Sequence, residues 1–253
     1  MIDWRHWGDP ATARIRLICL PYAGGSASIF HVWQRSLPAD VSISAPMLPG
    51  RGRLATEPLL EEMAPLIEAT DRTGRDLLRA PYVIYGHSMG ALVAYAWLRR
   101  ALDDGAPPPE QLFVAASRPP FMPSWMRPVR DQGDDELLRV MLWMQSGEAK
   151  PAPVDYLRRQ LPLLRADLLA CETLIPDHDR RPLPTPLVAL GGRNDPLVKS
   201  ADLQAWSALA GRGFVRHTLP GGHFFALNQP APLLRLLDRA LTPGAALWAE
   251  ESA

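Results

Sequence analysis

One stretch of sequence is the most informative about the architecture of this protein: Tyr82-Val83-Ile84-Tyr85-Gly86-His87-Ser88-Met89-Gly90-Ala91-Leu92-Val93-Ala94. An apolar, β-type run breaks at Gly86, and an apolar, alanine-rich run begins at Met89. The pattern G-x-S-x-G between them is typical of a sharp turn from a strand into a helix, where flanking glycines allow the two elements to approach closely. Such a turn lifts the Ser88 hydroxyl above the carboxyl end of a parallel sheet, so Ser88 is a candidate nucleophile. The alternative is a structural turn in which Ser88 only caps the helix.

Apolar runs alternate with helical patterns along most of the chain. Strands are predicted at residues 15–20, 41–48, 82–85, 111–117, 186–190 and 214–219. Helices are predicted at residues 29–37, 58–79, 89–102, 134–145, 154–175, 200–209 and 230–241. Near-continuous apolar strands separated by helices indicate a parallel sheet that is covered on both faces.

The length of 253 residues fits one large α/β domain. We predict a single domain over residues 1–253, with a core made of residues 1–117 and 183–242. Residues 118–182 show helical patterns but no convincing strand, so we expect them to form a helical lid insertion. Six large side chains of this segment either line an acyl channel or form the small core of the lid: Phe121, Trp125, Met126, Met141, Trp143 and Met144.

Composition excludes several classes of function. Lys+Arg and Asp+Glu both number 27, and this balance argues against general nucleic-acid binding. No apolar run is long enough for a membrane span, and the first residues do not resemble a secretory signal. Cys19 and Cys171 match no metal-binding spacing, and Cys19 is expected to be a buried thiol. We therefore expect a cytoplasmic protein that uses no metal or cofactor.

A serine hydroxyl becomes a good nucleophile when a histidine takes its proton and an acid orients that histidine. In parallel sheets with this kind of turn, the chain order is serine, acid, histidine. Asp195 follows one late predicted strand, and His223 follows the last one. Both residues should therefore lie at the same sheet edge as Ser88, and the three form a predicted catalytic triad for acyl transfer.

Other acids and histidines fit this role less well. His87 lies inside the turn and should point into the structure beneath the serine. Asp177 and Asp179 belong to the predicted lid rather than to a strand end. Some relatives of this fold place the acid after an earlier strand, but here that site reads Ser117-Arg118-Pro119 and offers no carboxylate.

Acyl transfer also needs two N–H donors where negative charge develops on the carbonyl oxygen. The amide of Met89, at the start of the predicted helix, is one candidate. The other is Ala23, in the glycine-rich loop Pro21-Tyr22-Ala23-Gly24-Gly25-Ser26 that follows the first predicted strand. This loop lacks the Lys-Ser/Thr pair of a P-loop and the full G-x-G-x-x-G spacing, so the pattern favours an oxyanion hole over a phosphate site.

Five motifs together resemble the type II thioesterases of polyketide and nonribosomal peptide biosynthesis. They are Leu20-Pro21-Tyr22-Ala23-Gly24-Gly25, Pro49-Gly50-Arg51-Gly52-Arg53, Gly86-His87-Ser88-Met89-Gly90, Gly191-Gly192 with Asp195, and Gly221-Gly222-His223-Phe224-Phe225. The resemblance implies an α/β-hydrolase fold, with a mostly parallel central sheet flanked by helices and a helical lid. It implies Ser88, Asp195 and His223 as the triad, and Ala23 and Met89 as the oxyanion hole.

The resemblance also implies a monomer that removes misprimed or stalled acyl groups from the phosphopantetheine arm of acyl or peptidyl carrier proteins. Because carrier proteins are usually acidic, a basic docking surface is expected, with candidates Arg51, Arg53, Arg127, Arg130, Arg158 and Arg159. For any single one of them an ordinary surface residue is the favoured interpretation, and Arg51 and Arg53 could instead brace their own loop. A general esterase or lipase, an acyltransferase and a binding module with an inactive site remain as alternatives.

Overall fold

The architecture rests on a seven-stranded sheet seen in a computed structural model, which describes residues 2–79, 81–123, 127–146, 151–174 and 180–242. The strands are β1 (Asp3–Trp7), β2 (Ile15–Leu20), β3 (Val41–Met47), β4 (Tyr82–His87), β5 (Gln111–Ala115), β6 (Leu187–Gly192) and β7 (Phe214–Leu219). Their spatial order is β1-β3-β2-β4-β5-β6-β7. All neighbouring pairs are parallel except β1 with β3, so strands β2 to β7 end at the same edge of the sheet.

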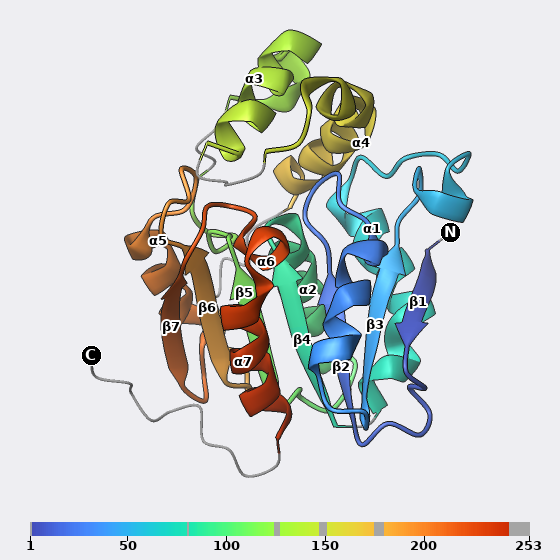
Figure 1. The fold of residues 1–253 in the computed structure, drawn as a ribbon. Coiled ribbons are helices and arrows are strands. Elements are labelled where there is room, and N and C mark those ends of the chain that lie inside the picture. Colours follow the sequence, from blue (N-terminus) through green and yellow to red (C-terminus); the bar gives the residue numbers. More distant parts are fainter. Residues whose placement is uncertain (1, 80, 124–126, 147–150, 175–179, 243–253) are drawn as a thin grey trace.

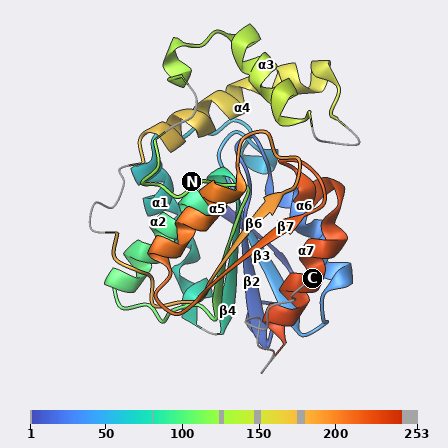
Figure 2. The same ribbon diagram turned by 90° about the vertical axis from the view of Figure 1, so that its left-hand side faces the viewer.

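Helices cover both faces of this sheet (Figures 1 and 2). One layer holds α1 (Met63–Gly74), α2 (Met89–Asp103) and α5 (Ser200–Ala205), and the other holds η1 (Ala27–Ser36), α6 (Phe225–Asn228) and α7 (Pro230–Leu241). Strand β4 supplies side chains to both layers because successive residues point to opposite faces. Tyr82 and Ile84 pack in the core with α1 and α2, whereas Val83 and Tyr85 pack in the core with η1 and α7.

The segment predicted as a lid lies over the carboxyl edge of the sheet (Figures 1 and 2). It contains η4 (Val129–Asp131), α3 (Asp134–Met144) and α4 (Val154–Glu172), and its described residues form no strand. Val129, Leu137, Leu138, Leu157 and Leu161 form a small core of their own. The carboxyl end of α4 is tied to the body of the protein, because the Thr173 hydroxyl accepts a hydrogen bond from the Met63 amide (2.8 Å).

The structure differs from the sequence prediction most clearly at one helix start and at one additional strand. The helix predicted over residues 58–79 begins at Met63 and continues after Gly74 as a 3₁₀ helix, η3 (Arg75–Arg79). Pro65 explains the later start: it has no N–H for a helical bond to Glu61, and it is tolerated only in the first turn. Strand β1 was not predicted; it pairs with β3 alone, at the edge of the sheet, and only Trp4 in it is buried.

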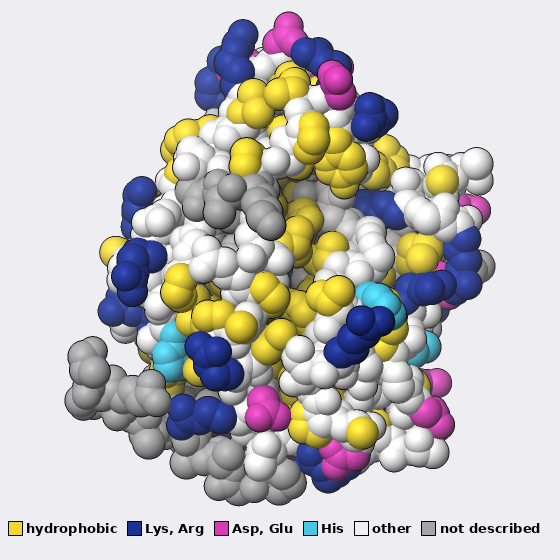
Figure 3. Space-filling view, in the orientation of Figure 1, with side chains coloured by type: hydrophobic (Ala, Val, Ile, Leu, Met, Phe, Trp, Pro, Cys, Tyr) yellow, Lys and Arg dark blue, Asp and Glu magenta, His cyan; other side chains and the backbone are white. Residues whose placement is uncertain are grey.

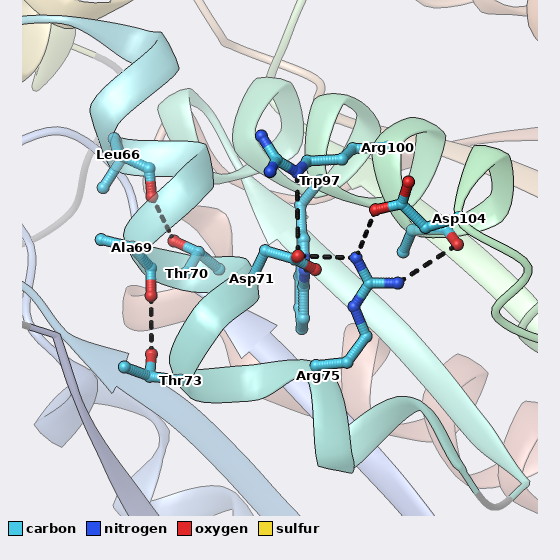
Figure 4. Close-up of polar contacts among 10 residues, drawn as sticks. Leu66, Ala69, Thr70, Asp71, Thr73, Arg75, Trp97, Arg100 and Asp104 are labelled. Carbon is cyan, nitrogen blue, oxygen red and sulfur yellow. Dashed lines mark hydrogen bonds and ion pairs between the residues drawn. The ribbon is translucent and has the colours of Figure 1, made fainter.

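A polar cluster joins α1 to α2 behind the sheet (Figure 4). The buried Asp71 accepts a hydrogen bond from Trp97 Nε1 (2.8 Å) and pairs with Arg75 (2.6 Å). Arg75 in turn reaches Asp104 (2.8 Å), just beyond the end of α2. The Asp71 carboxylate of α1 therefore accepts hydrogen bonds from Trp97 of α2 and from Arg75, which follows α1 directly.

The first prediction concerns this cluster. Asp71→Asn should lower the free energy of unfolding by about 2 kcal/mol, because it removes the more buried of the two charge partners of Arg75 and weakens the charge-assisted hydrogen bonds at this position. Urea denaturation measures the change. The exposed pair Arg79–Asp76 provides the control, since its side chains are 77% and 81% exposed. Asp76→Asn should not change stability measurably, and equal losses in the two variants would contradict the account.

Candidate active site

Ser88 occupies a strained turn between β4 and α2. Its backbone has φ 54° and ψ −116°, a conformation that L-residues rarely adopt. The turn is held because the Ser88 amide donates to the Ala115 carbonyl (2.7 Å), at the end of the neighbouring strand. A Cβ atom at Gly86 would lie 2.3 Å from the Gly90 carbonyl oxygen, so both elements pass too closely for any side chain there. The predicted sharp turn is confirmed.

His223 and Asp195 reach Ser88 from the loops that follow β7 and β6. His223 Nε2 lies 3.1 Å from Ser88 Oγ, and His223 Nδ1 lies 2.9 Å from Asp195 Oδ2. Because a carboxylate can only accept, Nδ1–H donates to Asp195 and leaves Nε2 to accept the Ser88 proton. The structure thus brings together the three residues that the sequence singled out, in the order serine, histidine, acid.

Asp195 is held as a carboxylate by its surroundings. Burial alone raises the pKa of Asp195, but the His223 charge and the hydrogen bonds outweigh it and hold the pKa below its ordinary value. Asp195 Oδ1 accepts from the amides of Leu197 (2.8 Å) and Val198 (3.3 Å), which leaves Oδ2 facing His223. An ionised, oriented acid of this kind fixes the imidazole tautomer that the serine needs.

The loops that carry Asp195 and His223 are in direct backbone contact. A Cβ atom at Gly192 would lie only 2.1 Å from the Gly222 carbonyl oxygen. The Asn194 amide also donates to the Gly221 carbonyl (2.9 Å). The two glycine-containing motifs noted in the sequence therefore set the separation between the acid and the histidine.

The two predicted oxyanion donors lie beside the serine. Ala23 and Met89 line the same cavity as Ser88 and His223, and Met89 is the first residue of α2. The amide of the first residue of a helix makes no bond within the helix, and it lies at the positive end of the helix dipole. Their role as oxyanion donors stays a prediction that this placement supports.

His87 has a role that the sequence did not indicate. Its ring is buried beneath the serine, as predicted, with Nδ1 2.9 Å from the Tyr85 hydroxyl and Nε2 2.9 Å from the His223 carbonyl oxygen. A carbonyl can only accept, so His87 Nε2–H donates to the backbone of His223. Burial, followed by the charge of His223, lowers the pKa of His87 to about 3. A neutral imidazole therefore supports the main chain of the candidate base.

An apolar cavity of about 420 Å³ opens beside Ser88. Figure 3 shows a hollow with apolar side chains gathered around it, beneath α3 and α4. Of the channel candidates, Met144 lines the cavity, whereas Phe121, Met141 and Trp143 do not, and Trp125 and Met126 lie outside the described residues. Lining residues that the sequence analysis missed include Leu92, Val140, Leu168, Cys171 and Leu174.

The two charged side chains Arg118 and Glu172 in the cavity wall have partners within the protein. Arg118 pairs with Asp202 (3.3 Å), and Glu172 accepts from the Val129 amide (2.6 Å). The wall therefore suits an alkyl chain better than a polar one.

Four of the six arginines proposed for docking have acidic partners. Arg51 is only 5% exposed and pairs with Asp167, so it is wrong as a docking residue and instead braces its loop. Arg53 pairs with Asp3, Arg127 with Glu136 and Arg158 with Asp135. Arg130 and Arg159 are exposed.

The remaining candidates add no second site. Asp177 and Asp179 lie outside the described residues. Cys19 is a buried thiol, as predicted. Within the described ranges, no group of three His, Cys, Asp or Glu side chains is arranged to hold a metal ion. Among those same residues, no helix is long and apolar enough to cross a membrane.

Comparison with known proteins gives consistent matches over nearly the whole chain. A family model described as "Thioesterase domain" matches residues 15–241. The gramicidin S biosynthesis protein GrsT of Aneurinibacillus migulanus is 28% identical and aligns over 91% of this chain and 90% of its own length. The RedJ thioesterase of the prodiginine pathway in Streptomyces coelicolor is 38% identical, with a TM-score of 0.84, covering 92% of this chain and 88% of RedJ.

The type II thioesterase BorB, from the borrelidin biosynthetic cluster, is 30% identical with a TM-score of 0.85. The match covers 94% of this chain and 97% of BorB. These structural neighbours confirm the predicted α/β-hydrolase fold with its mostly parallel sheet.

The buried His87 generates a prediction about pH. An unfolded chain binds a proton at His87 below about pH 6.5, whereas the folded chain does so only near pH 3. The free energy of unfolding should therefore fall as the pH falls through this window. The contribution of His87 between pH 7 and pH 5 is about 2 kcal/mol.

Urea unfolding at both pH values tests this, with His87→Gln as the comparison. Glutamine keeps an amide N–H for the His223 carbonyl but does not titrate. The variant should lose correspondingly less stability over the same interval. The same pH dependence in both proteins would refute the account of His87.

Proposed function

Because this chain belongs to the thioesterase family, we propose that it removes aberrant or stalled acyl groups from the phosphopantetheine arm of acyl or peptidyl carrier proteins. The predicted relationship to type II thioesterases is confirmed, and the chain is a serine hydrolase of thioesters. Relatives that belong to antibiotic and related biosynthetic pathways support an editing role beside a polyketide synthase or a nonribosomal peptide synthetase.

The observation that carries the proposal is the bridge made by His223 between Ser88 (3.1 Å) and Asp195 (2.9 Å). In the first step, His223 Nε2 takes the Ser88 proton as Oγ attacks the thioester carbonyl carbon. Negative charge builds on the carbonyl oxygen, where the amides of Ala23 and Met89 would stabilise it. The carbon–sulfur bond then breaks, and His223 returns the proton to the departing thiolate.

In the second step, water replaces the thiol. His223 takes a proton from this water as its oxygen attacks the acyl-serine carbonyl, and the same two amides would hold the oxyanion. The tetrahedral intermediate then collapses and the ester bond breaks. His223 passes the proton to Ser88 Oγ, and the free acid leaves. These steps are complete with side chains and backbone amides of this chain and use no metal or cofactor.

We further propose that residues 118–182 act as a lid over the active site. The segment covers the edge where Ser88 lies, and α3 and α4 supply Val140, Met144 and Leu168 to the cavity wall. Closing over the acyl chain would exclude bulk water from the first step. A cytoplasmic monomer that meets an acidic carrier protein through exposed arginines is part of the same proposal.

The test of this function uses an acylated carrier protein and follows the loss of its acyl mass by time-resolved mass spectrometry. Wild type should release the acyl group, and Ser88→Ala should slow release by about 10³-fold or more. Ser117→Ala is the matched control. Ser117 lines the same cavity, but its hydroxyl donates to the Arg118 carbonyl instead of facing His223. This variant should stay within threefold of wild type.

The outcomes separate the alternatives. If wild type leaves acyl carriers intact and cleaves small esters, the general esterase takes first place. Transfer of the acyl group to an added alcohol or amine in preference to water would indicate an acyltransferase. If no acyl donor reacts, the remaining interpretation is a binding module with an inactive site.

The cavity also predicts how activity depends on the length of the acyl chain. Each methylene buried from water is worth about 0.8 kcal/mol, so kcat/KM should rise by about fourfold per added carbon until the cavity is full. Leu92→Trp narrows the cavity and should abolish this rise while sparing acetyl substrates. Steady-state kinetics on acyl-pantetheine thioesters of increasing length measure how kcat/KM depends on chain length.

The control for this prediction is Leu142→Trp. Leu142 lies on α3 but is 40% exposed and does not line the cavity. Added bulk there should leave the dependence on chain length unchanged. A flat profile for wild type, or the same profile for Leu92→Trp and wild type, would show that the cavity does not hold the acyl chain.

A further inference from the structure

A buried ion pair joins three segments that are distant in the sequence. Arg51, in the loop after β3, pairs with Asp167 of α4, and the two side chains are only 4% and 6% exposed. Asp167 Oδ2 also accepts the amide N–H of Gly24 (2.6 Å), in the loop after β2. The pair therefore meets the loop that holds Ala23, the predicted oxyanion donor.

The loop itself is a tight turn. The Gly25 amide donates to the Tyr22 carbonyl (2.8 Å), and Gly24 has φ +77°. A β-turn with positive φ at its third residue, as in type II, holds the peptide bond between its second and third residues in one defined orientation. That central peptide joins the Ala23 carbonyl to the Gly24 N–H, so the hydrogen bond from Gly24 to Asp167 fixes its orientation and with it Ala23.

Arg51 fixes the other end of the turn. Its Nε donates to the Gly25 carbonyl (2.6 Å), and its Nη1 donates to the Pro49 carbonyl (2.9 Å). Burial raises the pKa of Asp167, while the Arg51 charge and the Gly24 amide oppose that rise, so both contacts favour the carboxylate. All three guanidinium nitrogens are thus committed to this junction.

Helix α4 also packs directly on the turn. A Cβ atom at Gly24 would lie 3.8 Å from Leu164 Cβ, which is one helical turn from Asp167. Leu164 belongs to the main core, whereas Leu157 and Leu161 pack with α3 in the small core of the lid. Pro162 lies between these two groups, so Asp167 is on the half of α4 that is anchored to the body of the protein.

We propose that Asp167 and Arg51 are positioning residues, which hold the turn Tyr22–Gly25 so that the Ala23 amide faces the oxyanion. Stabilisation by a fixed donor depends on its placement before the reaction begins. Two hydrogen bonds to the residues that follow Ala23, at the Gly24 amide and the Gly25 carbonyl, provide this placement. The inference rests on the proposed function, because it assigns the pair a part in the same acyl-transfer site.

The experiment compares Asp167→Ala with Asp71→Ala. Both remove a buried carboxylate paired with arginine, but Asp71 lies between α1 and α2, away from the cavity lining (Figure 4). Asp167→Ala should lower kcat on an acyl-pantetheine thioester by about 10- to 100-fold with KM within about threefold of wild type. Asp71→Ala should lose stability but keep both constants within about threefold.

A second readout does not depend on the natural substrate. A fluorophosphonate probe labels Ser88 when Oγ attacks phosphorus, the Ser88 proton passes to His223 and fluoride leaves. Negative charge develops on the phosphoryl oxygen in the five-coordinate transition state, so the labelling rate also reports the oxyanion hole. Labelling should slow in Asp167→Ala in parallel with kcat. Asp167→Asn, which keeps an oxygen acceptor for the Gly24 amide, should recover part of the loss. If wild type is labelled but hydrolyses no thioester, the proposed function fails while this comparison still tests the positioning role.

The double variant Arg51→Met/Asp167→Ala tests whether the loss of activity merely reflects a loss of stability. It leaves no unpaired buried charge, so it should melt closer to wild type than Asp167→Ala does. It should nevertheless remain slow in both readouts. Wild-type kcat and labelling in the double variant or in Asp167→Ala would overturn the inference. Failure of all three Asp167 variants to fold would overturn it as well, because the pair would then be a structural brace.

Discussion

The whole site depends on one close contact between backbones. A Cβ atom at Gly90 would lie 2.2 Å from the Leu20 carbonyl oxygen, so the first turn of α2 rests directly on the end of β2. This contact places the loop that begins at Pro21, and with it Ala23, beside the start of the helix. It also explains why Ser88 tolerates its unfavourable φ. The strained backbone of Ser88 costs of order 1–3 kcal/mol. The favourable packing of β2, β4 and α2 around the turn offsets this cost.

Parallel strands then assemble the remaining chemistry from distant parts of the sequence. Strands β4, β6 and β7 end at one edge, so Ser88, Asp195 and His223 meet although 135 residues separate the serine from the histidine. Buried groups behind this edge keep the geometry rigid. His87 supports the backbone of His223 from below, and Asp167 of α4 together with Arg51 supports the loop after β2. The candidate base His223 and the loop that holds Ala23 are thus each held by a buried polar partner.

Much of this could be predicted from the sequence because the informative residues follow strands directly. The turn at Ser88, the six parallel strands and the residues of the candidate triad each have a local pattern. The cavity wall has none: which face of α2 and α4 turns towards the serine depends on packing, so Leu92 and Leu168 read as ordinary core residues. Arg51 and Asp167 lie 116 residues apart, and no local signal connects them. Edge strand β1 was missed because it has a single buried side chain.

The central claim is that Ser88 carries the acyl group between the thiol and water. Rapid-quench mixing with an acyl-pantetheine thioester, followed by proteolysis and peptide mass spectrometry, tests it most directly. The peptide containing Ser88 should gain the acyl mass within the first turnover and lose it as free acid appears. Free acid that accumulates at the full rate while no peptide is acylated, or while another side chain carries the acyl group, would contradict it.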